Sequence, residues 1–122
     1  MPHRNLVSTE LAKLFGVLSH PIRVRIIEEL HHKSLSVNEL KDILSITHSA
    51  VSQQLAILRA NHLVVETRQG RNVYYALREP QLAAWIADGL GFISPDRSAF
   101  ESMLAAIEQT KSIWTAEDTD SK

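Results

Sequence analysis

The sequence predicts a mainly α-helical chain with a single β-hairpin between its fourth and fifth helices. Apolar residues recur at helical spacing through the first half of the chain, up to about residue 60. Over 63–77 the pattern changes, because Val, Thr and Tyr gather on both sides of Gly70. Helical spacing returns after Pro80. The expected order is therefore four helices, a hairpin and two further helices.

The first two helices are expected over 7–18 and 21–32. Each carries apolar residues on one side: Leu11, Leu14, Phe15 and Leu18 in the first, and Ile22, Ile26, Ile27 and Leu30 in the second. Pro21 suits the first turn of a helix, where its missing N–H is not needed. We expect His20, just before it, to cap the second helix.

Two shorter helices follow, and each has a start signal. Ser36 and Glu39 form a capping box, in which the serine oxygen accepts the Glu39 amide and the Glu39 side chain reaches back. That helix is expected to end near Leu44. Thr47 is the next N-cap candidate, and it begins a helix that runs to about residue 60.

The hairpin is expected to pair 63–68 with 71–77 around a turn at Gln69-Gly70. Pro80 is expected to begin the fifth helix, and Ser94-Pro95-Asp96 to begin the sixth. Their stripes are apolar: Leu82, Trp85, Ile86, Gly89 and Leu90 in the fifth, and Phe100, Met103, Leu104, Ile107 and Trp114 in the sixth. We expect one domain over 1–114 and a disordered acidic tail over 115–122.

Two short helices joined by a tight turn and followed by a hairpin make a winged helix-turn-helix. The helix that follows Thr47 would enter the major groove of double-stranded DNA. Val51, Leu55 and Leu58 fall on its core stripe. The residues expected to face DNA are Thr47, His48, Ser49, Ser52 and Gln53, with Ala56 where close approach is needed. Glutamine and serine can hydrogen-bond base edges, and no acidic residue lies within 45–61 to repel phosphate.

The hairpin adds a basic tip to this surface. Arg68 and Arg71 bracket its turn and can reach phosphates or the minor groove. The net charge of the whole chain is −1, but it is unevenly distributed. Residues 1–80 hold ten Lys/Arg and seven Asp/Glu, whereas 81–122 hold three and seven. The half that carries the motif is therefore mildly basic.

Four segments of the chain resemble the ArsR/SmtB repressors. They are Leu18-Ser19-His20-Pro21-Ile22-Arg23, Leu35-Ser36-Val37-Asn38-Glu39-Leu40, the run from Ser49 to Arg59, and the run from Gly70 to Leu77. The resemblance covers about 11–90 and implies a homodimer joined through the first and last helices. It also implies repression at imperfect inverted repeats, with release of DNA when an effector binds.

The chain departs from that family at its known metal sites. Many members carry two cysteines on the third helix, where this chain has Ser36 and Asn38. Others bind metal between their fifth helices, but Glu79, Gln81 and Asp88 supply no histidine there. After the recognition helix, His62 replaces a common glycine, so we expect Asn61 to take the left-handed cap.

No cofactor is predicted, although a divalent metal stays an open possibility. Glu28 and His32, one helical turn apart, are the first two ligands to consider, with His3 on a mobile arm as a third. The alternative is that His31 and His32 are cations favoured at a helix C-terminus, and we prefer it. His48 is assigned to the DNA face.

The sequence also argues against other classes of protein. It has no cysteine, no phosphate-binding glycine loop and no nucleophile elbow, so we expect no enzyme. No apolar run suits a membrane span or a signal peptide, and we expect a cytoplasmic protein. Two alternatives stay open: a winged-helix protein-interaction module, and a metal-responsive repressor with His and carboxylate ligands.

A dimer interface is expected at Leu11, Leu14, Phe15, Phe100, Leu104 and Ile107. The effector is a non-thiophilic metal, a small organic molecule, or none.

Overall fold

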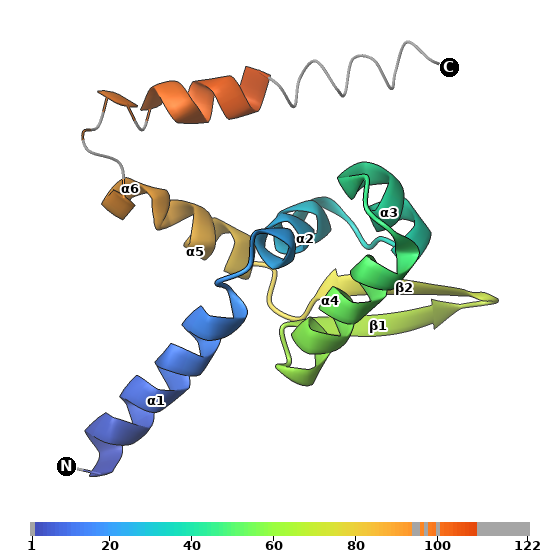
Figure 1. Ribbon diagram of the computed structural model, residues 1–122, viewed down its shortest axis with the longest axis horizontal. Helices are drawn as coiled ribbons and strands as arrows, with labels where there is room; N and C mark the ends of the chain where they lie inside the picture. Colours follow the sequence, from blue (N-terminus) through green and yellow to red (C-terminus); the bar gives the residue numbers. More distant parts are fainter. Residues whose placement is uncertain (1, 94–95, 97, 100, 110–122) are drawn as a thin grey trace. The chain divides into compact units, whose positions relative to one another are not determined.

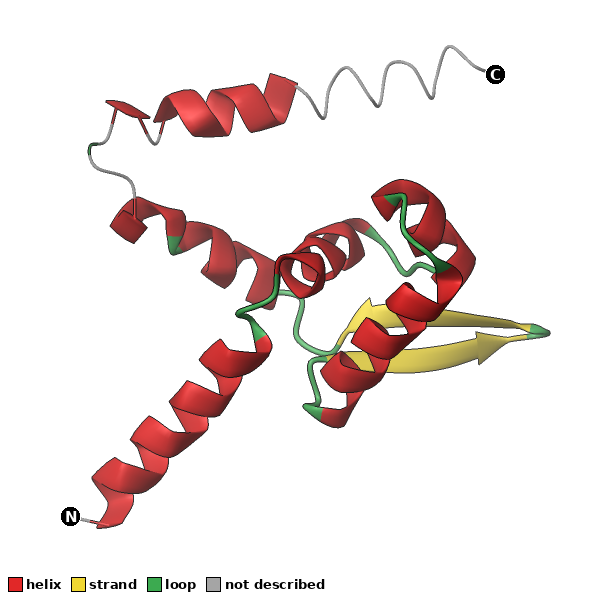
Figure 2. Cartoon of the chain, viewed as in Figure 1, coloured by secondary structure: helices red, strands yellow, loops and turns green. Residues whose placement is uncertain are grey.

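The computed structural model describes residues 2–93, 96, 98–99 and 101–109 (Figure 1). The chain forms two compact units, Met1–Ala83 and Ala84–Lys122, which are described separately. In the first unit, four helices are followed by a two-stranded hairpin (Figure 2). This order confirms the predicted mainly helical fold with a β-hairpin.

Helix α1 covers Pro2–Val17 and α2 covers Pro21–His32. Helix α1 begins earlier than the predicted residue 7, because nothing between Pro2 and Val7 breaks a helix and proline is compatible with its first turn. The prediction for α2 is confirmed at both ends. His20 is its N-cap, as expected, and the His20 Nδ1 atom accepts the Ile22 amide at 3.2 Å.

Helix α3 covers Val37–Leu44 and α4 covers His48–Ala60. Both predicted caps are present. Ser36 Oγ accepts the Glu39 amide at 3.2 Å while Glu39 Oε1 accepts the Ser36 amide at 3.1 Å. Thr47 Oγ1 accepts the Ala50 amide at 3.0 Å. These bonds satisfy amides that have no partner within the first turn, and so they fix where both helices begin.

The core of this unit lies between α2, α3, α4 and the base of the hairpin. Its members are aliphatic and nearly inaccessible: Ile26, Ile27, Leu30, Leu35, Leu40, Val51, Leu55, Leu58, Val64 and Leu77. The predicted core stripe of α4 is therefore confirmed in full. Burial of Val51, Leu55 and Leu58 on one side leaves the opposite side of α4 facing outward.

The hairpin consists of β1, Val64–Gln69, and β2, Asn72–Leu77, paired antiparallel with Gln69 opposite Asn72. The turn is Gly70-Arg71, one residue later than the predicted Gln69-Gly70. Gly70 has a φ of 64°, which glycine adopts freely at the first central position of a two-residue hairpin turn. Leu35 adds an antiparallel bridge to Tyr75, with N–O distances of 3.0 and 2.8 Å, which ties the start of α3 to β2.

The connection after α4 differs from the expectation. Asn61 has a φ of −95°, and it is His62 that adopts the left-handed conformation, with a φ of 61°. The prediction for Asn61 was wrong because the Asn61 side chain turns back onto the helix, where its Nδ2 donates to the Ile57 carbonyl at 2.8 Å. The chain therefore reverses one residue later, at the position where relatives were expected to have glycine.

Beyond the hairpin, α5 covers Leu82–Asp88 and α6 covers Leu90–Ile93. The predicted fifth helix was wrong in two respects: it begins at Leu82 rather than Pro80, and Gly89 interrupts it before Leu90. Residues 101–109 are helical, where the sixth helix was expected. Phe100, Trp114 and the predicted tail over 115–122 lie outside the described residues.

Candidate nucleic-acid interface

Helix α4 presents a polar outer face. Thr47, His48, Ser49 and Gln53 are exposed, Ala56 is exposed, and Ser52 is partly exposed. The structure thus places Ser49, Ser52 and Gln53 on the side of α4 opposite its buried stripe, and Thr47 and His48 at the start of the helix. Their side chains offer hydroxyls, an amide and an imidazole, which can donate or accept hydrogen bonds at base edges. The Thr47 oxygen is engaged in the cap, so this hydroxyl keeps its proton to donate.

The hairpin places two arginines at its tip. Arg68 lies in β1 opposite Val73, and Arg71 lies in the turn itself. Both are exposed, and within 2–93, 96, 98–99 and 101–109 neither has a hydrogen-bond or ion-pair partner. An arginine without a protein partner keeps all five donors for a ligand, and its guanidinium matches a phosphate.

A cluster of three side chains, which sequence reasoning missed, joins α4 to the hairpin. Arg59 Nη1 lies 3.2 Å from Glu66 Oε2, and the Tyr75 hydroxyl donates to the same oxygen at 3.3 Å. Burial raises the pKa of the Tyr75 phenol above its usual value of 10.0, and the Glu66 carboxylate raises it further. The Arg59 guanidinium acts in the opposite direction. The predicted turn at Gln69-Gly70 would have placed Glu66 opposite Val73, whereas the observed register places it opposite Tyr75. Sequence reasoning therefore missed both contacts of Glu66.

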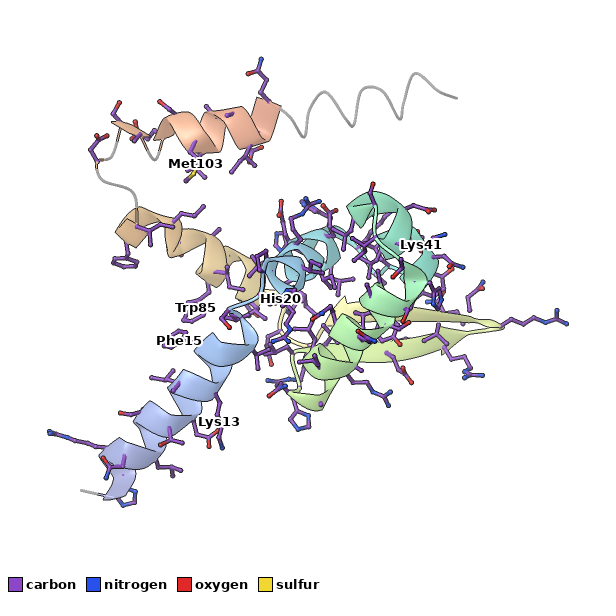
Figure 3. The ribbon with its side chains drawn as sticks, in the orientation of Figure 1. Lys13, Phe15, His20, Lys41, Trp85 and Met103 are labelled. Atoms are coloured by element: carbon purple, nitrogen blue, oxygen red, sulfur yellow. The ribbon has the colours of Figure 1, made fainter. Side chains whose placement is uncertain are left out.

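The acidic groups near this face are engaged. Glu66 pairs with Arg59, Glu39 caps α3, and Asp42 lies 3.7 Å from Lys41 Nζ on the same helix, where Lys41 is labelled in Figure 3. Within α4 and the hairpin, both of which the structure describes throughout, Arg68 and Arg71 are the Lys, Arg, Asp or Glu residues without a partner. This distribution favours an anionic ligand across α4 and the hairpin.

The predicted dimer residues expose apolar surface. On α1, Leu11 and Phe15 are 45% and 53% exposed, Leu14 is half-buried, and Leu6 and Val7 extend the stripe toward the N-terminus. In the second unit, Leu104 is half-buried and Ile107 is 37% exposed. Phe100 lies outside the described residues.

The residues considered for a metal do not form a site in the described ranges. Glu28 lies near Arg25, with Oε2 and Nε 3.7 Å apart, and the His31 and His32 rings meet edge to face at 5.4 Å. No group of three or more His, Asp or Glu side chains comes together in the part of the chain that the structure describes. Among these same residues, no helix is long and apolar enough to cross a bilayer.

Fold and site together define a class, the winged helix-turn-helix proteins, in which a capped helix and a basic wing form one surface. Residues 18–68 match the family described as a helix-turn-helix domain. The chain is 36% identical over 72 residues to the transcriptional repressor PagR of Bacillus anthracis, which covers 58% of this chain and 72% of PagR. It is 41% identical over 70 residues to the SmtB homolog of Synechocystis, a transcriptional repressor, which covers 57% of this chain and 53% of that protein.

Solved structures of similar proteins have the same fold as this chain. Reduced HlyU from Vibrio cholerae superposes with a TM-score of 0.65 at 28% identity, over 79% of this chain and all of HlyU. The repressor BigR from Xylella fastidiosa gives 0.63 at 32% identity, over 75% and 90% of the two chains. The chain belongs to the ArsR/SmtB family of winged helix-turn-helix repressors, as its sequence motifs indicated. It nevertheless spans only about half the length of the Synechocystis relative.

Proposed function

We propose that this protein represses transcription by binding an inverted-repeat operator as a homodimer. One observation carries the proposal. Helix α4 buries Val51, Leu55 and Leu58 while it exposes Ser49 and Gln53, and the hairpin that follows α4 carries two arginines that have no partner among the described residues. A polar helix face next to a free basic hairpin fits the major groove and the adjacent backbone better than it fits a protein partner.

In the proposed complex the two parts of the interface have different tasks. The exposed α4 residues, Ser49, Ser52 and Gln53, read base edges in the major groove. Arg68 and Arg71 bind phosphates or the minor groove beside it and set the register of the helix without reading sequence. His48 and Thr47, at the start of α4, lie where helix N-termini approach phosphate.

The homodimer supplies the symmetry that an inverted repeat requires. The exposed stripe of α1, with Leu11 and Phe15, is too apolar to leave in water, and Leu104 and Ile107 provide a second apolar stripe. Pairing two copies through these stripes would place two recognition helices about 34–36 Å apart, one turn of DNA. The relatives of this chain are named as transcriptional repressors, which supports the repressor role in this proposal.

The proposal assigns no enzymatic activity, metal or cofactor to the chain. Ser36 and Asn38 stand where thiolates serve as metal ligands in many members of the family, and neither side chain can replace a thiolate. The proposal therefore includes no thiophilic effector at this place.

The deciding experiment is an in vitro selection of random duplex DNA by the purified protein at moderate salt, with light scattering on the same sample. Enrichment of an inverted repeat by a dimer supports the proposal. A variant in which Ser49 and Gln53 are both alanine should enrich no repeat while it stays dimeric. Weak binding without a consensus by the wild type, or a monomer at micromolar concentration, would contradict the proposal and favour a protein-interaction module.

A further inference from the structure

Arg23, near the start of α2, connects two helices that the proposed function uses in different ways. Its Nε donates to Gln54 Oε1 on α4 at 2.8 Å, and its Nη1 donates to the Val17 carbonyl at 3.1 Å. Val17 is the last residue of α1, the helix with the exposed apolar stripe. One side chain therefore contacts both the end of the proposed dimer helix and the proposed recognition helix.

The chemistry of this contact makes it directional. The guanidinium is planar and rigid, so two bonds from its edge fix the angle between their acceptors. Both bonds are partly buried, where hydrogen bonds are stronger than in water. The Val17 carbonyl belongs to the last turn of α1, where carbonyls have no partner within the helix and a nearby arginine satisfies them.

The apolar core cannot supply the same constraint. Helices α2 and α4 are held together by buried side chains such as Ile26, Ile27 and Leu55, and burial of apolar surface has no preferred direction. Among the described residues, none of these buried core side chains belongs to α1, so the core does not set the angle of α1. The Arg23 bonds to Val17 and Gln54 supply directional contacts that join the end of α1 to α4.

The two adjacent glutamines of α4 are separated by this arrangement. Gln54 is partly buried and its oxygen accepts from Arg23, whereas Gln53 is exposed and belongs to the proposed DNA face. Helical geometry turns successive side chains about 100° apart, so one glutamine can face inward while the next faces DNA. Gln54 is therefore available for positioning and Gln53 for reading bases.

We propose that Arg23 and Gln54 are positioning residues that set the distance and angle between the two recognition helices of the dimer. This inference rests on the proposed function, because a fixed angle between α1 and α4 matters only when α1 pairs two copies. In a dimer joined through α1, a change in the α1–α4 angle moves both recognition helices at once. The operator property that depends on that angle is the spacing between half-sites, not the sequence of each half-site.

The test measures binding to three operators that share the selected half-sites but differ in the spacer, which is native, one base pair shorter or one base pair longer. Each step displaces a half-site by about 3.4 Å along the DNA axis. The variants are Arg23→Lys, which keeps the charge but loses the planar fork, and Gln54→Met, which keeps the length but loses the acceptor. Gln54→Glu keeps an acceptor for Arg23 and serves as the rescue variant.

The wild type should prefer the native spacer. In Arg23→Lys and Gln54→Met that preference should fall about tenfold, while affinity for a single half-site stays unchanged. The double variant should lose no more than Arg23→Lys alone, because Arg23→Lys already removes the bond to Gln54 that Gln54→Met breaks. Gln54→Glu should keep the preference. Arg25→Lys, whose side chain pairs with Glu28 and Glu29 along α2, is the matched control and should behave as wild type.

The outcomes separate this inference from the proposed function. If folded Arg23→Lys and Gln54→Met keep the wild-type preference for the native spacer, this inference is wrong while the proposed function stands. A wild type that selects no spaced repeat overturns the proposed function, and the inference falls with it. Thermal unfolding of each variant shows whether it is folded. If Arg23→Lys does not fold, the spacer preference of Gln54→Met tests the inference.

Discussion

Arg59, in the last turn of α4, forms an ion pair with Glu66 in β1, with 3.2 Å between Nη1 and Oε2. The contact joins the recognition helix to the hairpin at the surface, since the side chains of Arg59 and Glu66 are 58% and 36% exposed. Exposed pairs of this kind contribute little free energy, commonly about 0–1 kcal/mol. The importance of this pair is therefore its charge, because it neutralises Glu66, the one acidic residue within 45–78, the segment that contains α4 and the hairpin.

The first prediction concerns that carboxylate. Glu66→Gln should bind DNA of any sequence more tightly, because it removes a negative charge and frees Arg59 for phosphate. The affinity should become more sensitive to salt, with the slope of log K against log salt steeper by up to about 0.9. Fluorescence anisotropy at several salt concentrations measures both quantities. Equal or weaker binding by Glu66→Gln would show that this carboxylate does not face the bound DNA.

A second prediction follows from the raised pKa of Tyr75, which has burial as its main cause and Glu66 as the next. The unfolded chain loses the phenol proton near pH 10, whereas the folded chain keeps it to higher pH. Stability from this group is thus fully present below about pH 10 and is lost as the pH rises through the folded pKa. Urea unfolding should show a smaller loss above pH 10 for Tyr75→Phe. An identical loss in both proteins would contradict the pKa shift.

The third prediction concerns the hairpin tip. Arg71→Ala should weaken binding to all DNA sequences by a similar factor, and it should make the salt slope shallower by about 0.9 for the lost phosphate contact. Arg25→Ala removes a cation from α2 that already pairs with Glu28 and Glu29, and it should leave the slope nearly unchanged. A loss confined to particular operator sequences would instead place Arg71 against bases.

The fourth prediction separates reading from positioning on α4. Gln53→Ala should relax the preference at one base-pair position of each half-site, at a cost of about 1–3 kcal/mol against the preferred operator. Binding to unrelated DNA should change little. Competition against operators altered at single positions locates the affected base pair. If Gln53→Ala weakens every sequence alike, the glutamine contacts the backbone rather than a base.

Local sequence patterns predicted the helices and strands of this fold well, but they could not predict contacts between residues far apart in the chain. The capping box at Ser36 and the core stripe of α4 depend on residues spaced three or four positions apart along the chain, so spacing alone reveals them. The Arg23–Gln54 bond joins residues 31 positions apart, and no local pattern indicates it. The site residues on α4 follow from which side of the helix is buried. That Arg68 and Arg71 have no partner among the described residues could be seen only from the positions of those residues in the structure.

The turn after α4 shows how a local rule can select the wrong residue. Asparagine tolerates the left-handed conformation, which made Asn61 the expected cap. Its side chain instead donates to the Ile57 carbonyl at 2.8 Å and keeps Asn61 next to the helix. The reversal then falls on His62, whose carbonyl accepts from Arg78 Nε at 2.6 Å. The competing side-chain bond decided the outcome.

The last prediction uses this pair of residues. His62→Gly should stabilise the protein, because a non-glycine residue in the left-handed region costs about 1–2 kcal/mol. Glycine is also more flexible in the unfolded chain, and this entropy lowers the gain in stability by about 0.5–1 kcal/mol. The His62 side chain is exposed, and Arg78 bonds to its carbonyl, so glycine keeps the known contact. The expected net effect is an increase of up to about 1.5 kcal/mol in the free energy of unfolding.

Asn61→Gly is the matched control, one residue earlier and with the opposite sign. Its φ of −95° gains nothing from glycine, and the bond to the Ile57 carbonyl is lost. We expect a loss of about 0.5–1.5 kcal/mol, in keeping with one hydrogen bond. Urea unfolding of the two variants beside the wild type measures both effects. Destabilisation by His62→Gly would mean that the imidazole makes a stabilising contact that outweighs the backbone strain.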